Sequence, residues 1–155
     1  MSLEEAVRAY SDTLYKICIV IMRNEQDAQD VIQETFCKYL ELVPIFTDAA
    51  HEKAWLIKVA VNKCKDLLRF RFRHPQVPID VLAESLVIEQ EQQDALTELL
   101  ELPIKQRTVI YLYYVEGYRI KEIAGMLGIS SQAVKKRMQR GREQLRVFWK
   151  EECCR

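Results

Sequence analysis

Basic side chains crowd the segment GISSQAVKKRMQRGREQLR, residues 128–146, in which Glu143 is the only acid. Lysine and arginine neutralise phosphate groups, and together with glutamine they reach hydrogen-bonding groups on base edges. The chemistry that these residue types can perform is therefore recognition of a nucleic acid. The basic side chains are Lys135, Lys136, Arg137, Arg140, Arg142 and Arg146.

Charge alternates in sign along the chain, although the net charge is zero. Residues 51–74 carry a net charge of +5 and residues 119–150 carry +7, whereas residues 1–50 carry −5 and residues 75–104 carry −7. For any single block, a solvated helix face is the competing interpretation. Two basic blocks, each on one predicted helix, favour two separate contacts with a polyanion. The acidic blocks then indicate a protein partner or mutual electrostatic masking.

Catalytic and metal-binding motifs are missing from the sequence. There is no phosphate loop, no nucleophile beside a placed base, and no metal-ligand spacing among the five cysteines and two histidines. We therefore expect no enzymatic activity, no cofactor and no metal site. No apolar run approaches the roughly 18 residues of a membrane helix, and the N-terminus is acidic where a signal peptide is basic. We expect a cytoplasmic protein without membrane insertion.

Apolar residues recur at helical spacing in the first part of the chain. The pattern predicts a first helix over residues 3–22 and a second that has Asn24 as its N-cap and ends before Pro44. A third helix is expected from His51 to Arg69 or slightly beyond. Together the three helices can enclose one small core.

The segment RHPQVPID, residues 73–80, contains two prolines in four positions and no helical stripe, which is typical of a linker. The sequence thus predicts an all-α fold of two small helical domains joined by a flexible linker. The first domain is expected over residues 1–72, the linker over residues 73–88, and the second domain over residues 89–155.

The second domain is expected to contain a helix-turn-helix. Helices predicted over residues 84–102 and 103–116 precede an apolar stripe over residues 120–127, after which Gly128 can take a left-handed cap and Ser130 can cap another helix. The last helix buries one stripe, formed by Val134, Met138, Gly141, Leu145 and Phe148. The opposite side fits the major groove of DNA, and it carries Gln132, Lys135, Lys136, Gln139 and Arg140.

Three segments resemble conserved regions of the sigma factors of bacterial RNA polymerase, in the extracytoplasmic-function group of the sigma-70 family. DAQDVIQETFCKYLE, residues 27–41, is similar to the second conserved region, and AWLIKVAVNKCKDLLRFRFR, residues 54–73, is similar to the promoter-melting helix. Residues 102–146 resemble the fourth region. The resemblance implies a factor that binds core RNA polymerase, recognises the minus-10 and minus-35 elements of promoter DNA, aids melting, and has an anti-sigma factor as a partner.

The resemblance also implies roles for individual residues. Contact with the polymerase is expected from Asp30, Gln33 and Glu34. Contact with the minus-10 element is expected from Phe46, His51, Lys58, Asn62, Lys65 and Arg69, while Trp55 is assigned to the core. In the minus-35 helix, Gln132, Lys136 and Gln139 are expected to read bases and Arg142 and Arg146 to bind phosphates, supported by Ser130, Ser131, Lys135 and Arg140.

Two other interpretations remain open at this point. A helix-turn-helix regulator that binds duplex DNA without polymerase accounts for the C-terminal half and leaves residues 27–73 unexplained. A helical adaptor that binds only proteins leaves both basic blocks unexplained.

Overall fold

This computed structural model of the protein describes residues 2–42, 44–70 and 90–145, with the backbone alone for residue 70 and residues 90–95. Every regular element within these ranges is a helix, which confirms the predicted all-α fold. The helices differ in length and regularity, and each follows from a local signal in the sequence.

The chain divides into two compact units, Met1–Gln76 and Val77–Arg155. Each unit has its own buried core, as expected for two small helical domains. The linker predicted over residues 73–88 lies outside the described residues. Its bounds, and those of the domains predicted over residues 1–72 and 89–155, therefore stay predictions.

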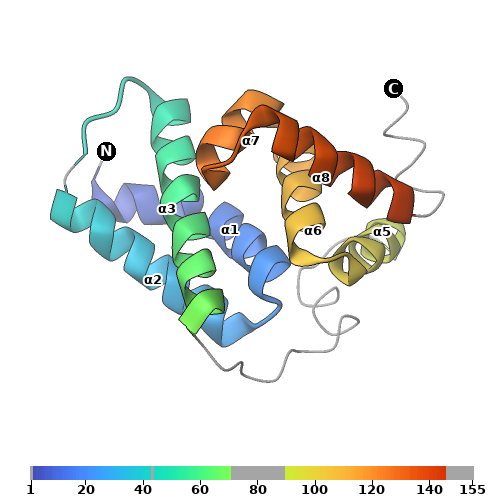
Figure 1. Cartoon of the computed structure of the whole chain (residues 1–155). Coiled ribbons are helices and arrows are strands. Elements are labelled where there is room, and N and C mark those ends of the chain that lie inside the picture. The colour runs from blue at the N-terminus through green and yellow to red at the C-terminus, as the bar shows by residue number, and fades with distance from the viewer. Residues whose placement is uncertain (1, 43, 71–89, 146–155) are drawn as a thin grey trace. The chain divides into compact units, whose positions relative to one another are not determined.

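Three helices form the N-terminal unit, and each packs against the other two (Figure 1). They are α1 (Leu3–Met22), α2 (Glu25–Leu42) and α3 (Ala49–Phe70). Burial of each large aliphatic side chain contributes about 1.5–3 kcal/mol to the stability of such a core. The buried side chains include Leu14, Ile17, Cys18, Val31, Leu56, Ile57 and Cys64.

Side-chain caps fix where these helices begin. The Asn24 Oδ1 atom accepts a hydrogen bond of 2.9 Å from the backbone N–H of Asp27, which confirms Asn24 as the cap of α2. The start predicted for α3 at His51 is wrong, because the helix begins at Ala49. Asp48 Oδ1 accepts a 2.8 Å hydrogen bond from the His51 N–H and so caps the helix two residues earlier.

The described residues of the C-terminal unit form five helical segments around a second apolar core. They are α5 (Gln90–Glu101), α6 (Ile104–Ile110), η1 (Tyr111–Val115), α7 (Ile120–Leu127) and α8 (Ser131–Gln144). Helix α8 packs against both α6 and α7. The part of the helix predicted before Gln90 lies outside the described residues. The largest fully buried side chains are Leu99, Leu100, Ile110, Leu112, Ile123 and Met138.

The sequence predicts a single helix over residues 103–116, and the structure corrects this prediction. Pro103 precedes α6 as its N-cap, with ψ 151°, and the helix changes at Tyr111 into the π-helical turn η1. The N–H of Glu116 donates to the carbonyl of Tyr111 at 3.2 Å, a hydrogen bond that spans five residues. Periodic apolar residues do not distinguish this wider turn from a continuous α-helix.

The helix-turn-helix has the predicted turn chemistry. Gly128 ends α7 in the left-handed conformation with φ 68°, and its N–H donates to the carbonyl of Ala124. Ser130 then caps α8, because its Oγ atom accepts a 3.1 Å hydrogen bond from the N–H of Ala133. Gly128 and Ser130 therefore set the position at which α8 begins.

Gly141 allows α8 to approach α6 closely. A Cβ atom at this position would overlap Cδ1 of Ile110 and lie 3.3 Å from Cβ of Gln106. Ile110 is fully buried, so its side chain has little room to move. The glycine is required here for packing, although glycine lowers the intrinsic stability of a helix interior.

We predict that Gly141→Ala destabilises the protein relative to a matched substitution at Gly125. A Cβ atom at Gly125, in α7, would meet no atom within 4 Å, so Gly125→Ala should raise the free energy of unfolding by about 0.5–1 kcal/mol. Overpacking against Ile110 should leave Gly141→Ala about 1–3 kcal/mol less stable than Gly125→Ala. Urea unfolding followed by circular dichroism measures both values, and equal stabilities would contradict the close approach.

Candidate functional site

The outward side of α8 carries exposed polar and basic side chains. Its buried side consists of Val134, Met138 and Gly141. On the opposite side the structure exposes Ser130, Gln132, Lys135, Lys136, Gln139 and Arg140. Ser131 and Arg142 are partly buried, and Arg146 lies outside the described residues. Most of the side chains predicted to meet DNA at the minus-35 element therefore share one solvent-facing side of one helix.

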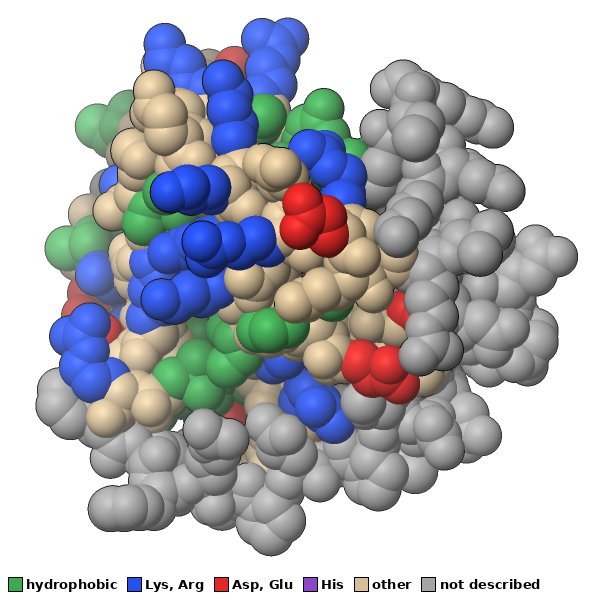
Figure 2. Space-filling view, turned by 45° about the vertical axis from the view of Figure 1, so that its right-hand side comes forward, with side chains coloured by type: hydrophobic (Ala, Val, Ile, Leu, Met, Phe, Trp, Pro, Cys, Tyr) green, Lys and Arg blue, Asp and Glu red, His purple; other side chains and the backbone are tan. Residues whose placement is uncertain are grey.

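The electrostatics of this surface favour an anion. The N-terminus of α8 adds the positive end of the helix dipole to the lysines and arginines. Glu143 is the only acid in α8, and its Oε1 atom lies 3.5 Å from Nε2 of Gln139. Figure 2 shows Lys and Arg side chains gathered on the face that it presents, with few acidic side chains among them.

A side-chain hydrogen bond links Arg142 to the π-helical turn. Its Nη1 atom donates a 3.1 Å hydrogen bond to the hydroxyl of Tyr114, a residue 28 positions earlier in the chain. The Tyr114 ring in turn meets the Tyr113 ring edge to face, with centroids 4.8 Å apart. Sequence reasoning missed Tyr114, because no local pattern connects η1 to the end of α8.

A second polar stripe runs along α3. Counted from His51, the predicted minus-10 residues stand 7, 11, 14 and 18 positions further on, which places them within a narrow sector of an α-helix. These residues are Lys58, Asn62, Lys65 and Arg69, of which Lys65 is partly buried and the others are exposed. The structure therefore brings the predicted phosphate-binding and base-contacting side chains of α3 to one side of the helix.

Phe46 belongs to a cluster of aromatic rings at the start of α3. Its ring lies 5.2 Å from the ring of His51, 5.7 Å from Trp55 and 6.2 Å from Tyr39, measured between centroids. The assignment of Trp55 to the core is wrong, because Trp55 is only partly buried and packs within this cluster. The loop is held by His51, whose Nδ1 atom accepts a 3.2 Å hydrogen bond from the N–H of Thr47.

A depression of about 290 Å³ opens beside Phe46. Its lining comprises Tyr39, Pro44, Phe46, Asp48, Ala49 and Glu52. Glu52 is buried, and its Oε2 atom accepts a 2.7 Å hydrogen bond from the Tyr39 hydroxyl. Burial, this hydrogen bond and the charge of Glu52 raise the pKa of Tyr39 to about 12, so its hydroxyl keeps its proton. Asn62 is not among the lining residues, whereas Phe46 is.

Sequence reasoning missed Tyr39 and Glu52 as possible site residues. Tyr39 falls on the apolar stripe of α2, which suggested an ordinary core residue. Glu52 lies in the first turn of α3, where an acid is explained by the helix dipole alone. Tyr39 meets Glu52 because the chain turns back after α2, so that α3 packs against α2.

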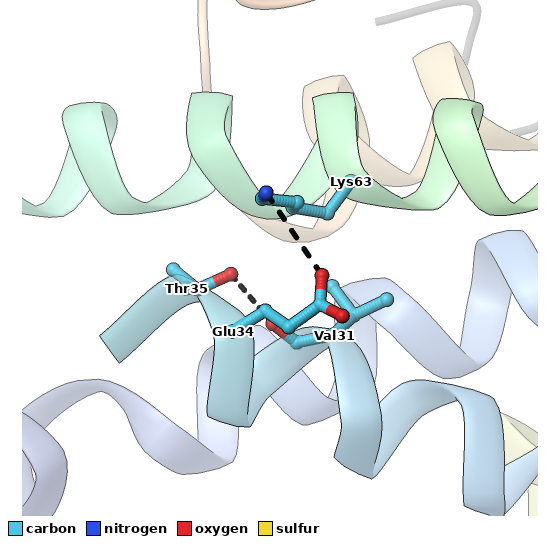
Figure 3. A network of polar contacts seen from close by, with 4 residues as sticks. All are labelled: Val31, Glu34, Thr35 and Lys63. Atoms are coloured by element: carbon cyan, nitrogen blue, oxygen red, sulfur yellow. Dashed lines mark hydrogen bonds and ion pairs between the residues drawn. The ribbon is translucent and has the colours of Figure 1, made fainter. Parts of the chain in front are cut away.

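The side of α2 expected to bind polymerase is polar and accessible. Asp30 is partly buried and accepts a 3.0 Å hydrogen bond from Nε2 of Gln26, while Gln33 and Glu34 are exposed. Figure 3 shows Glu34 directed toward Lys63 of α3, with an Oε2 to Nζ distance of 3.9 Å. An ion pair as exposed as this one contributes about 0–1 kcal/mol to stability.

The described cysteines have no arrangement for metal binding. Cys18 and Cys64 are buried in the core, and Cys37 is exposed. A hydrogen bond with Cys18 and burial hold the pKa of the Cys64 thiol well above its ordinary value, which leaves the thiol unreactive. Among the described residues, no cluster of three or more histidine, cysteine or acidic side chains could hold a metal, and no helix is long and apolar enough to cross a membrane.

Comparison with known proteins connects both units to one family. The family model of sigma-70 region 2 matches residues 6–73, and that of sigma-70 region 4 matches residues 92–145. The ECF RNA polymerase sigma factor SigW of Bacillus subtilis (strain 168) is 30% identical over 162 residues, with 92% of this chain and 86% of SigW covered. The residues matched include α2, α3 and α8.

Two solved structures are similar in fold. CnrH in complex with the cytosolic domain of CnrY is 28% identical, with a TM-score of 0.64 over 92% of this chain and 83% of that chain. The sigma factor RpoE from Bartonella quintana, in complex with the anti-sigma factor NepR, has a TM-score of 0.69 over 91% of this chain and 92% of that chain. At 22% identity, the second likeness shows the fold alone.

We predict that Tyr39 ionises later than an ordinary tyrosine. Because its pKa in the folded protein is about 12, above the value of about 10 in an unfolded chain, it stabilises the fold fully below pH ~10. That contribution is lost as the pH rises from ~10 to ~12. When tyrosine ionisation is followed by near-ultraviolet absorbance, the contribution of Tyr39 should appear near pH ~12. This contribution should be missing in Tyr39→Phe, and in Glu52→Gln it should appear at a lower pH. An unchanged titration of Tyr39→Phe would contradict the assignment.

Proposed function

Since this chain belongs to the extracytoplasmic-function group of bacterial sigma factors, within the sigma-70 family, we propose that its two units contact two separate promoter elements. The N-terminal unit binds core polymerase and opens the minus-10 element, and the C-terminal unit reads the minus-35 element. A polymerase-independent regulator is not favoured, because it leaves the match over residues 6–73 without a role.

The observation that carries this proposal is that each unit presents a stripe of exposed basic and amide side chains on one helix. On α3 the stripe includes Lys58, Asn62 and Arg69, and on α8 it includes Lys136 and Gln139. Both stripes lie opposite a buried apolar side, so they are available without unfolding the core. A protein-binding adaptor would not need two such surfaces.

At the minus-35 element, α8 enters the major groove. Gln132, Lys136 and Gln139 reach base edges, since amide and ammonium groups match the hydrogen-bonding pattern displayed there. Ser130, Ser131, Lys135, Arg140, Arg142 and Arg146 bind phosphates and set the orientation of the helix on the duplex. The position of Arg142 beside Tyr114 supports a contact that orients the helix rather than one that reads a base.

At the minus-10 element, α3 and the loop before it hold a single strand. Lys58, Lys65 and Arg69 neutralise backbone phosphates, and Asn62 contacts a base. Phe46 offers an aromatic surface on which an unstacked base can lie, with His51 beside it; such stacking contributes about 1–3 kcal/mol per base. Capture of a base in this way favours the melted promoter over the duplex.

Binding to polymerase uses the polar side of α2. Asp30, Gln33 and Glu34 form part of an acidic N-terminal segment, residues 1–50, whose net charge is −5. The partner surface is accordingly expected to be basic. Sigma factors act as initiation factors, so no catalytic residue, cofactor or metal is assigned, and the place of action is the cytoplasm.

A protein inhibitor is the further partner that we propose. The structures of CnrH and of the sigma factor RpoE both contain a bound protein, named for RpoE as an anti-sigma factor. By the same relation, this chain is held inactive by an anti-sigma factor until released.

Transcription in vitro tests the proposed function as a whole. Purified chain is added to core polymerase with a library of promoter fragments, and the start sites are sequenced. Sigma activity requires the polymerase for promoter-specific initiation. Specific DNA binding that is unchanged by the polymerase, without initiation, would support the regulator instead.

We predict that replacing Asp30 and Glu34 together with lysine abolishes binding to core polymerase. The change reverses the charge of the proposed contact and removes the exposed pair of Glu34 with Lys63 and the exposed hydrogen bond of Asp30 with Gln26. Exposed contacts of this kind contribute little to stability, so the fold should persist. Glu4→Lys with Asp12→Lys, on α1, is the matched control, because it changes the net charge equally at exposed positions of the same unit. Pull-down assays compare the two; equal polymerase affinity would contradict the α2 contact.

We also predict that base-reading and phosphate-binding residues of α8 respond differently to alanine. Lys136→Ala should weaken the preferred promoter by about 1–3 kcal/mol and relax the preference at one or two positions. Arg142→Ala should weaken all promoters alike and lower the salt slope by about one. Tyr114→Phe is the control, since it keeps the Arg142 charge and should keep the salt slope. Holoenzyme binding to promoter variants at several salt concentrations measures these effects, and identical behaviour of Lys136→Ala and Arg142→Ala would contradict the division.

A further inference from the structure

Two acidic residues, Asp48 and Glu52, line the depression beside Phe46, although the stacking of a base on an aromatic ring does not require them. Glu52 lines it and is only 4% exposed, so its carboxylate is largely removed from water. A buried carboxylate is costly unless it is hydrogen-bonded, and Glu52 accepts one such bond from Tyr39. The volume, about 290 Å³, is near the lower end of small-molecule pockets, which measure about 300–1,000 Å³.

The polar groups around this depression offer acceptors to a ligand. Tyr39 already donates its hydroxyl proton to Glu52. The hydroxyl of Tyr10, which does not line the depression, donates to the carbonyl of Ala49 at 3.3 Å and also interacts with Glu52. Asp48 accepts from the N–H of His51 through Oδ1. A carboxylate has about four lone-pair sites and no proton to donate when ionised, so Glu52 and Asp48 can accept further hydrogen bonds but cannot supply them.

We propose that Glu52 selects the captured base by accepting a hydrogen bond from an exocyclic amino group, and so discriminates against thymine. Adenine, cytosine and guanine each carry an amino group on the edge that becomes free when the base leaves the duplex. Thymine has no amino group, and its single N–H on that edge stands between two carbonyl oxygens, which a carboxylate repels. Phe46 and Tyr39 supply aromatic surfaces that tolerate any base, and Glu52 adds the preference.

This inference rests on the proposed capture of a single-stranded base beside Phe46. The hydrogen bond between Tyr39 and Glu52 holds the carboxylate in place at the edge of the aromatic cluster. Tyr39 is therefore a positioning residue, while Glu52 would touch the base. Replacing Glu52 with glutamine keeps the size of the side chain and an acceptor for Tyr39, and it adds an amide donor that suits thymine.

Binding of holoenzyme to pre-melted promoters tests the inference. The probes are templates with a fixed mismatched bubble over the minus-10 element, in which each single-stranded position carries adenine, cytosine, guanine or thymine in turn. For the unaltered chain we expect one position at which thymine lowers affinity on the order of tenfold relative to the best amino-bearing base. In Glu52→Gln that difference should fall to about twofold or less, because the amide donates to thymine.

Two variants separate the possible outcomes. Phe46→Ala should weaken binding for all four bases at the same position; if it does not, and no position shows any base dependence, the proposed capture itself is wrong. If base dependence is present but Glu52→Gln leaves it unchanged, capture stands and the role of Glu52 is wrong. Tyr39→Phe retains the carboxylate but removes the hydrogen bond that positions it, so it should reduce the discrimination against thymine by less than Glu52→Gln does. A loss equal to that of Glu52→Gln, with both variants folded by circular dichroism, would also overturn the inference.

Discussion

The constraint on which this structure depends is that each helix has to bury one side in a small core and can use only the other. In α8 the buried Val134, Met138 and Gly141 leave a single outward sector, and in α3 the buried Leu56, Ile57 and Cys64 do the same. Each unit is too small to bury a polar surface as well. The surfaces proposed to meet DNA and polymerase are therefore the sides that the cores do not need, and their residues follow the helical period.

Local signals allowed much of this arrangement to be predicted from the sequence. Asn24, Gly128 and Ser130 act within four residues of themselves, so their caps and turns were predicted correctly. The outward residues of α8 followed from the same periodicity. The start of α3 was misplaced by two residues, because Asp48 was interpreted as part of a loop.

Contacts between distant parts of the chain could not be predicted in this way. The hydrogen bond from Tyr39 to Glu52 joins residues of two helices, and that from Arg142 to Tyr114 spans 28 positions. Both depend on how helices pack, and a tyrosine on an apolar stripe gives no sign of the carboxylate it will meet. The π-helical turn at Tyr111–Val115 was missed for a related reason, since its apolar residues fit an ordinary helix equally well.

The glycine at position 141 has a mechanical consequence for the proposed contact with the promoter. Helices α6 and α8 pack so closely at Gly141 that a methyl group would not fit, and a hydrogen bond links Arg142 of α8 to Tyr114 of η1. Helix α8 therefore has little freedom to tilt within its unit. A groove whose width or curvature differs from the shape of α8 must then be deformed to fit it. The stiffness of the DNA would thus enter into which promoters are preferred, even at base pairs that no side chain touches.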